Sequence, residues 1–203
     1  MIFDNSEFTK ELNEKLHNKA HGGVVSFVTD TVWGVGCLPE NEKGAENIYA
    51  LKNRDRSKPL ILMSDSVEHL LPYVKNIPTK ARELMEKHFP GALTLIFEKS
   101  DKTPDYITSY KNTVGIRVPD NPVFKRLCEV VDGHVLATTS ANLSGQDAAS
   151  NYEEALKNVG AHVDYVFEDY GFLCQGLAST VALALDDEIK VPVSYTHLTL
   201  PTI

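Results

Sequence analysis

The stretch LKNRDRSKPLILM, residues 51–63, passes from the end of an expected helix to the start of an expected buried strand. It concentrates cations in a chain that has 20 Lys and Arg residues against 28 Asp and Glu residues. These cations are Lys52, Arg54, Arg56 and Lys58. Cations gathered before a strand can bind a phosphorylated ligand. A solvated helix end, with cations facing the negative helix dipole, also explains Lys52 and Arg54, but it explains Lys58 less well.

On both sides of this stretch, helical and strand patterns alternate. We expect helices near residues 6–16, 45–51, 67–71, 79–88, 122–131 and 152–158. We expect strands at residues 24–28, 60–63, 93–97, 114–118, 135–138, 165–167 and 180–183, with a loop over residues 29–39. Such alternation predicts an α/β fold with one twisted, mixed central sheet flanked by helices. Because no repeat or linker divides the pattern, we expect a single domain.

Length, charge and cysteine content narrow the class of protein. With 203 residues and 42% hydrophobic content, the chain can bury one sizeable core. A net charge of −8 disfavours a surface that coats nucleic acid, because such binding neutralises many phosphates. The sequence shows neither a run of about 18 apolar residues nor a secretory signal, so we expect a cytoplasmic location. Its three scattered cysteines, without Cys-x-x-Cys or Cys/His spacing, predict neither disulfides nor a metal site built from protein ligands.

The sequence lacks the familiar motifs of several enzyme classes. It has no P-loop motif, and Cys37 follows Gly34-Val35-Gly36 where a dinucleotide fingerprint needs a different continuation. It has no serine in a G-x-S-x-G elbow. Any chemistry is therefore expected to depend on positioning and charge stabilisation, without a protein nucleophile.

Besides the cationic stretch, three segments at expected strand ends are candidate binding sites. In residues 28–36, hydroxyl groups, backbone amides and Trp33 can hold a small polar ligand, or they can form an ordinary turn. In residues 112–119, Arg117 stands between apolar neighbours, so its charge needs a partner. An acidic ligand and a protein carboxylate are equally good candidates for that partner. In residues 137–145, small polar side chains suit phosphate or ribose contacts, although a turn that caps the next helix is the better explanation by itself.

The order of these segments resembles the YrdC-type threonylcarbamoyl-AMP synthase family over roughly residues 11–185. The family's Pro-Thr-Glu-Thr-x-Tyr-Gly-Leu-Gly loop is matched by residues 28–36, and its Lys-x-Arg-x-x-x-(Lys/Asn)-Pro-Leu segment by residues 52–60. The other matches are Trp-Pro-Gly-x-Leu-Thr at residues 89–94, Val-x-(Ile/Val)-Arg-x-Pro at 114–119, Ser-Ala-Asn at 140–142 and Ser-Thr-(Val/Ile) at 179–181. Each match is weak alone, but their shared order makes the resemblance specific.

The resemblance implies a single YrdC-like domain, which we place at residues 1–191, and a nucleotidyltransferase activity. Members of the family form L-threonylcarbamoyladenylate and pyrophosphate from L-threonine, bicarbonate and ATP. The product serves the threonylcarbamoyl-adenosine modification of tRNA beside the anticodon. The resemblance thus implies ATP as a substrate, Mg²⁺ bound through its phosphates, and tRNA met directly or through downstream transfer proteins.

The resemblance also implies roles for individual residues. Lys52 and Arg54 would stabilise the charge of the reacting phosphates. The implied ATP-binding residues are Lys52, Arg54, Lys58, Thr113, Ser140 and Asn142. The implied L-threonine-binding residues are Thr31, Arg117, Thr138 and Ser179, with Arg117 pairing the threonine carboxylate in a forked contact. Arg56 falls at a variable position and is expected to face solvent.

Several positions depart from the family pattern. Asp30 stands where the pattern has Glu, and Met63 stands where longer relatives often carry a threonine-contacting His. Family members usually follow the last strand with an Arg-x-Gly that contacts ATP, but neither Arg nor Gly occurs after Ser179. Residues 192–203 do not resemble the family, and we expect this tail to be foreign read-through sequence or disordered.

Other classes of function remain open from sequence alone. The main alternative is a module of the same fold that binds double-stranded RNA or tRNA without forming an adenylate, against which the net charge of −8 counts. A related enzyme that makes a carbamoyl-adenylate from another donor is a second alternative. A paralogue that keeps the cleft without a role in threonylation is a third.

Overall fold

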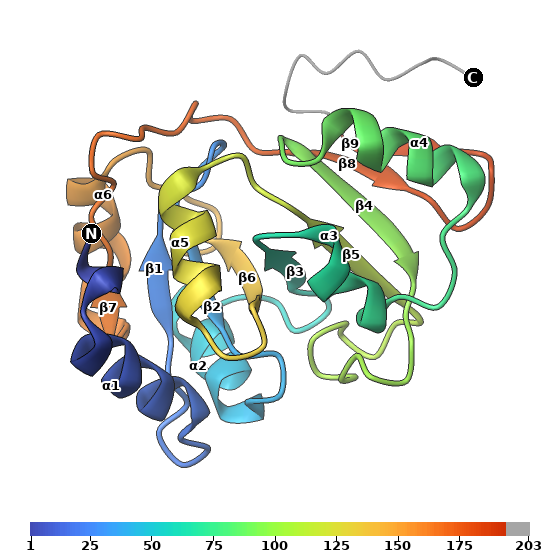
Figure 1. Cartoon of the computed structure of the whole chain (residues 1–203). Helices are drawn as coiled ribbons and strands as arrows, with labels where there is room; N and C mark the ends of the chain where they lie inside the picture. Colours follow the sequence, from blue (N-terminus) through green and yellow to red (C-terminus); the bar gives the residue numbers. More distant parts are fainter. Residues whose placement is uncertain (194–203) are drawn as a thin grey trace.

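The computed structural model describes residues 1–193, and its strands form one continuous sheet (Figure 1). The strands are β1 (Val25–Phe27), β2 (Gly34–Cys37), β3 (Ile61–Ser64), β4 (Leu93–Glu98), β5 (Thr113–Arg117), β6 (Val135–Ser140), β7 (Tyr165–Val166), β8 (Thr180–Leu183) and β9 (Lys190–Val193). Their order across the sheet is β7-β1-β2-β6-β3-β5-β4-β8-β9. The pairs β1–β7, β3–β5 and β4–β8 are parallel and the other pairs are antiparallel. The expected α/β fold with one mixed sheet is confirmed.

Helices flank both halves of this sheet. The α-helices are α1 (Ser6–His17), α2 (Glu42–Lys52), α3 (Val67–Leu70), α4 (Thr79–His88), α5 (Pro122–Val130) and α6 (Tyr152–Val159). Short 3₁₀ turns occupy η1 (Ile2–Asp4), η2 (Leu71–Tyr73) and η3 (Gly160–His162). In Figure 1, α1, α2, α5 and α6 gather around the half of the sheet that holds β1, β2, β6 and β7, whereas α3 and α4 lie beside the other half. None of the helices in residues 1–193 is both long and apolar enough to cross a membrane.

Asparagines fix where most of the longer helices begin. The side chains of Asn5, Asn41, Asn121 and Asn151 each accept a hydrogen bond from a backbone N–H in the first turn of the helix that follows. Such a cap satisfies donors that the helix itself leaves unpaired and contributes about 1 kcal/mol. The expected helix starts at residues 6, 79, 122 and 152 are confirmed.

The expected loop over residues 29–39 is wrong in part, because Gly34–Cys37 forms β2. This strand pairs with β1 on one side and with β6 on the other, so it lies inside the sheet. Its sequence, Gly-Val-Gly-Cys, offers little strand propensity, since glycine weakens isolated strands. A Cβ atom on Gly34 would lie 2.8 Å from the Phe27 ring, so glycine is required where that ring crosses β2.

The sheet also reaches further along the chain than expected. Strand β9 spans Lys190–Val193 and pairs with β8, so it runs past the boundary that we placed after residue 191. The rest of the predicted foreign or disordered tail, residues 194–203, lies outside the described residues.

Replacing Gly34 by alanine tests whether the close packing of Phe27 on β2 constrains the fold. Phe27 is fully buried, and its ring centroid lies 4.9 Å from that of Phe124 on α5, so the ring has little room to move. We expect Gly34→Ala to lower the free energy of unfolding by about 1–3 kcal/mol, the usual cost of overpacking. Urea denaturation monitored by circular dichroism measures this change in the free energy of unfolding.

The matched control is Gly160→Ala. Gly160 has helical backbone angles, φ −56° and ψ −33°, and an added Cβ there would meet its nearest neighbour at 3.5 Å. We expect this variant to change stability by less than about 0.5 kcal/mol. Equal stability of the two variants would show that the Phe27 ring accommodates a methyl group on β2.

Candidate active site

A cavity of about 160 Å³ lies where β2, β3, β5 and β6 meet the loop that follows β1. We call it the cleft. The residues that line it are Thr29, Thr31, Val32, Trp33, Gly34, Arg54, Pro59, Ile61, Met63, Arg117, Thr138, Thr139, Ser140, Ala178 and Ser179. It therefore draws on all four segments that the sequence analysis selected, although they are far apart in the chain.

Arg117, the last residue of β5, is the most deeply buried cation of the cleft, at 2% exposure. Its Nη2 forms an ion pair with Asp30, its Nη1 donates to Thr31 Oγ1 at 2.8 Å, and its Nε donates to the Gly91 carbonyl at 2.9 Å. Burial lowers the pKa of Arg117, while the carboxylate of Asp30 opposes that shift. Of the two explanations left open for Arg117, the protein carboxylate is present.

These contacts leave some N–H donors of the Arg117 guanidinium available to bind a ligand. A guanidinium has five N–H donors, and the three hydrogen bonds to Asp30, Thr31 and Gly91 use three of them. Arg117 also lines the cleft. An anion in the cleft can therefore reach Arg117 without first breaking all of its internal hydrogen bonds.

The loop after β1 is held by its own hydroxyl groups and by a distant segment. Thr29 Oγ1 donates to the Val32 carbonyl at 2.7 Å and lies 3.1 Å from Thr31 Oγ1. The backbone N–H groups of Gln175 and Gly176 donate to the carbonyls of Asp30 and Thr31 at 3.0 and 2.7 Å. The segment that leads to Ser179 thus lies against this loop and forms one wall of the cleft.

Lys52, the last residue of α2, lies behind the cleft rather than in its lining. Its ammonium group contacts the carbonyls of Ser140 and Asn142 at 2.5 and 2.8 Å and the Asn142 Oδ1 atom at 2.7 Å. Burial, with a smaller contribution from the nearby charge of Arg54, lowers the pKa of Lys52 to about 7. Lys52 therefore holds the polar turn that follows β6 through three acceptors.

The cationic turn after α2 divides into groups with different surroundings. Asn53 adopts the left-handed conformation, with φ 47°, and ends the helix. Arg54 lines the cleft and donates to the carbonyls of Lys58 and Pro59 at 3.2 and 3.1 Å. Lys58 is exposed. Arg56 is also exposed and lies over the Tyr49 ring, 5.2 Å from its centroid, which agrees with the expectation that it faces solvent.

The structure gathers most of the residues selected from the sequence. Those that line the cleft are Thr31, Arg54, Arg117, Thr138, Ser140 and Ser179. Lys52 and Asn142 lie directly behind Ser140. Lys58 and Thr113 are outside the lining set, and Thr113 lies at the opposite end of β5 from Arg117.

Sequence reasoning missed three groups that orient the selected residues. Asp30 was noted only as a substitution, although an acid in the loop after a buried strand can be the protein carboxylate that a buried Arg117 needs. The Gly91 carbonyl holds Arg117, and Thr94 Oγ1 lies 2.9 Å from Ser179 Oγ. Gly91 and Thr94 belong to the matched motif at residues 89–94, but the sequence does not show which groups they contact, because those contacts depend on how β4 pairs with β5 and β8.

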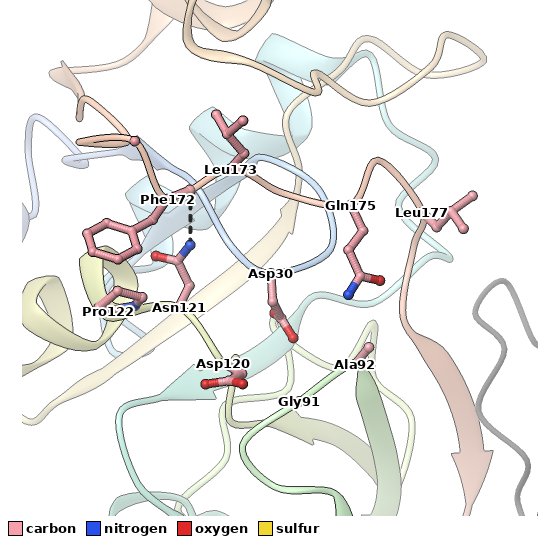
Figure 2. A pocket seen from close by; sticks show the side chains of 11 residues that line it. Asp30, Gly91, Ala92, Asp120, Asn121, Pro122, Phe172, Leu173, Gln175 and Leu177 are labelled. Carbon is pink, nitrogen blue, oxygen red and sulfur yellow. Dashed lines mark hydrogen bonds between the residues drawn. The ribbon is translucent and has the colours of Figure 1, made fainter.

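A larger cavity of about 690 Å³ adjoins the other side of Asp30 (Figure 2). Figure 2 shows the Asp30 carboxylate and the Gln175 amide pointing into it, with Asn121 bonded to the Phe172 carbonyl. Asp120 also lines it, and the described lining residues include neither Lys nor Arg. Asp30 is paired with Arg117, but Asp120 adds a second carboxylate and the described lining supplies no cation, so this cavity does not attract an anionic ligand. The smaller cleft, with Arg54 and Arg117, is therefore the candidate site for anionic substrates.

Together the fold and the cleft define a mixed α/β domain whose strand ends and following loops hold arginines and hydroxyl groups around one small cavity. The chain belongs to the Sua5/YciO/YrdC family. The model of that family, which carries the description "Telomere recombination", matches residues 19–192.

Curated relatives and solved structures agree with this membership. The chain is 35% identical over 152 residues to a threonylcarbamoyl-AMP synthase of Pseudoalteromonas translucida, covering 74% of this chain and 81% of the relative. It is 35% identical over 188 residues to a putative threonylcarbamoyl-AMP synthase of Methanocaldococcus jannaschii, covering 91% and 86%. A crystal structure of P. abyssi Sua5 complexed with L-threonine matches with a TM-score of 0.77 and 28% identity, covering 86% of this chain. The chain spans only 51% of that Sua5 protein.

Removing Asp30 tests how much the fold depends on the buried ion pair. In Asp30→Ala the buried guanidinium of Arg117 loses its counter-charge, and breaking a buried pair from one side costs about 3–5 kcal/mol. We expect the free energy of unfolding to fall by that amount in urea denaturation. In a double-mutant cycle, Arg117→Met in the Asp30→Ala background should recover part of the loss.

An exposed pair supplies the control. Asp132 lies 3.0 Å from His17 Nε2, and its side chain is 65% exposed. We expect Asp132→Ala to cost less than about 1 kcal/mol. If Asp30→Ala cost no more than this control, Arg117 would be solvated in solution and the buried pair would not constrain the fold.

Proposed function

We propose that this protein is a threonylcarbamoyl-AMP synthase, which forms L-threonylcarbamoyladenylate and pyrophosphate from L-threonine, bicarbonate and ATP. The observation that carries the proposal is that Arg54 and Arg117, which come from different elements, line one small cavity. A guanidinium pairs with phosphate and with carboxylate, so one arginine can bind ATP while the other binds the amino acid. The names of the curated relatives and the L-threonine in the Sua5 complex support the same activity.

The reaction needs charge stabilisation rather than a protein nucleophile. The amine of threonine combines with bicarbonate to give a carbamate and water. A carbamate oxygen then attacks the α-phosphorus of ATP, the bond from that phosphorus to the bridging oxygen breaks, and pyrophosphate leaves. Two anions must approach each other in this step, so fixed cations around the cleft lower its barrier. Mg²⁺ bound through the phosphates would neutralise the departing pyrophosphate.

The threonine site is proposed around Arg117. Its two remaining N–H donors would bind the carboxylate of threonine. Thr31, Thr138 and Ser179 line the same cleft and would bind the polar groups of the amino acid. Ser179 is oriented by Thr94, whose hydroxyl lies 2.9 Å away.

The ATP site is proposed around Arg54 and the turn after β6. Arg54 and Lys58 would bind phosphate oxygens, and Ser140, Asn142 and Thr113 would line the rest of the nucleotide site. Lys52 would act through Ser140 and Asn142, whose carbonyls it holds at 2.5 and 2.8 Å. A positively charged Lys52 under this turn also raises the potential where the phosphates bind.

The proposal also covers the extent of the domain, its location in the cell and the fate of its product. The YrdC-like domain would comprise residues 1–191 together with the end of β9 at residue 193, and it would act in the cytoplasm. Its product would reach tRNA directly or through downstream transfer proteins. An RNA-binding module without catalysis is not favoured, because the relatives carry an enzyme's name and the net charge is −8.

Release of pyrophosphate from ATP tests the proposed reaction. With bicarbonate present, we expect release to require L-threonine, to be slower with L-serine and to be absent without an amino acid. Arg54→Ala should reduce turnover about 100-fold, because it removes a cation that faces the developing charge. Folding should be preserved, since the Arg54 side chain interacts with groups close in the chain, namely the carbonyls of Lys58 and Pro59 and the nearby Tyr49.

Arg56→Ala is the matched control for Arg54→Ala. Arg56 comes from the same turn but is exposed and lies over Tyr49 outside the cleft. We expect its turnover to stay within about twofold of the unchanged protein. Equal turnover of both variants would contradict the role of Arg54, and release that ignores threonine would contradict the proposed substrate.

The lowered pKa of Lys52 makes ATP binding sensitive to pH. In the free protein Lys52 has a pKa of about 7, so it is mostly neutral at about pH 8. A nearby triphosphate favours the charged ammonium and raises this pKa, so binding should take up close to one proton at about pH 8 and little at about pH 6. Calorimetry of Mg-ATP binding in buffers of different ionisation enthalpy measures the uptake.

Lys52→Met removes this titrating group and is the comparison for that measurement. We expect the proton uptake at about pH 8 to disappear in the variant, with weaker ATP binding. Uptake of the same size in Lys52→Met would assign the proton to another group.

A further inference from the structure

Three groups that bind metals in other proteins gather outside the cleft. Asp65 directly follows β3, His69 lies on α3, and His134 lies in the loop between α5 and β6. One ligand atom from each residue lies within 4.8 Å of those from the other two. All three residues are partly buried.

The Asp65 carboxylate faces both imidazole rings. Its Oδ1 lies 2.9 Å from His69 Nδ1, and its Oδ2 lies 3.5 Å from His134 Nδ1. Two ligand atoms that share a tetrahedral zinc ion, with bonds of about 2.0–2.1 Å, lie about 3.3 Å apart. The two oxygen–nitrogen distances in this cluster, 2.9 and 3.5 Å, therefore lie on either side of the distance expected between two ligand atoms of one zinc ion.

His134 carries a polar atom that the described protein does not satisfy. Its Nδ1 is buried and makes no hydrogen bond to any described residue. Its backbone has φ 60°, which is unusual for a residue other than glycine, and Ser64 Oγ holds its carbonyl at 2.6 Å. The nearest described group is Asp65 Oδ2 at 3.5 Å, which is not a hydrogen bond, so this buried nitrogen on a strained backbone can still accept an ion as a partner.

The two rings must reorient to share an ion. His69 and His134 stack with centroids 4.2 Å apart and planes 15° apart. Nearly parallel rings cannot both point an in-plane nitrogen lone pair at one ion. Rotation of one ring solves this, and side chains that are 37% and 38% exposed have the space to rotate.

We propose that Asp65, His69 and His134 bind a divalent transition-metal ion of the Zn²⁺ class, with water completing the coordination. Two imidazole nitrogens and one carboxylate oxygen suit such an ion better than Mg²⁺ or Ca²⁺, which prefer oxygen ligands. The ion would tie the turn between β3 and α3 to the loop before β6. Asp65 follows Met63, a cleft residue, by two positions, so the ion would stabilise the floor of the cleft rather than react with substrates.

This site was not predictable from the sequence, because no Cys/His spacing indicates it. Asp65 and His69 are one turn apart on the chain, but His134 is brought to them by the pairing of β3 with β6, in which Ser64 lies opposite Val135. The third ligand is therefore visible only in the folded chain.

Titration of the full, tag-free chain with Zn²⁺ tests the proposal. Calorimetry should show one saturable ion per chain, and thermal unfolding should shift upward on addition of Zn²⁺. His69→Ala and Asp65→Asn should each weaken binding by at least tenfold to a hundredfold, the loss known even for residues that only support metal ligands. Co²⁺ should give visible absorption bands in the unchanged protein that are lost in both variants.

His21→Ala is the matched control, because His21 Nε2 lies 2.7 Å from Asp164 in a single His–Asp pair. Its Zn²⁺ affinity should equal that of the unchanged protein. Two results would overturn the proposal: no saturable binding by the unchanged protein, or binding that is equally strong in His69→Ala and Asp65→Asn. If one variant fails to fold, as judged by circular dichroism, the other variant and the Co²⁺ spectrum of the unchanged protein decide.

Discussion

The buried charge of Arg117 is the constraint on which the rest of the site depends. A guanidinium that is 2% exposed must be compensated, and Asp30, Thr31 and Gly91 supply the compensation from two other segments. This requirement fixes the loop after β1 against the end of β5. The backbone of Gln175 and Gly176 then binds that same loop, so Ser179 reaches the cleft as a further consequence.

Much of the fold was predictable because local signals agreed with the final structure. The helix starting at residue 122, for example, combines an asparagine cap, a proline in the first turn and an apolar face. Strand β2 was not predictable by the same means. Its glycines carry no strand signal, and glycine is required at Gly34 because the Phe27 ring crosses the strand there. The short strand β9 likewise depends on pairing with β8.

The candidate site was predictable in its residues but not in its contacts. Thr31, Arg54 and Arg117 were selected from the sequence, and they line one cavity. Lys52 was expected to meet phosphates, yet its ammonium group is occupied by Ser140 and Asn142. A sequence shows which side chains carry charge, whereas the direction of a lysine depends on which carbonyls the fold brings within reach.

The position of Trp33 gives the protein an internal optical reporter. It is the only tryptophan in the chain, it is fully buried, and it lines the cleft beside Thr31 and Arg117. Its backbone N–H donates to the Ala149 carbonyl, and its backbone carbonyl accepts a hydrogen bond from the Ala141 N–H. These two alanines lie at the two ends of the turn that contains Asn142. Because tryptophan can be excited at longer wavelengths than the eight tyrosines, its emission originates beside this one cavity, and a change in its wavelength or intensity reports on the cavity without any attached dye.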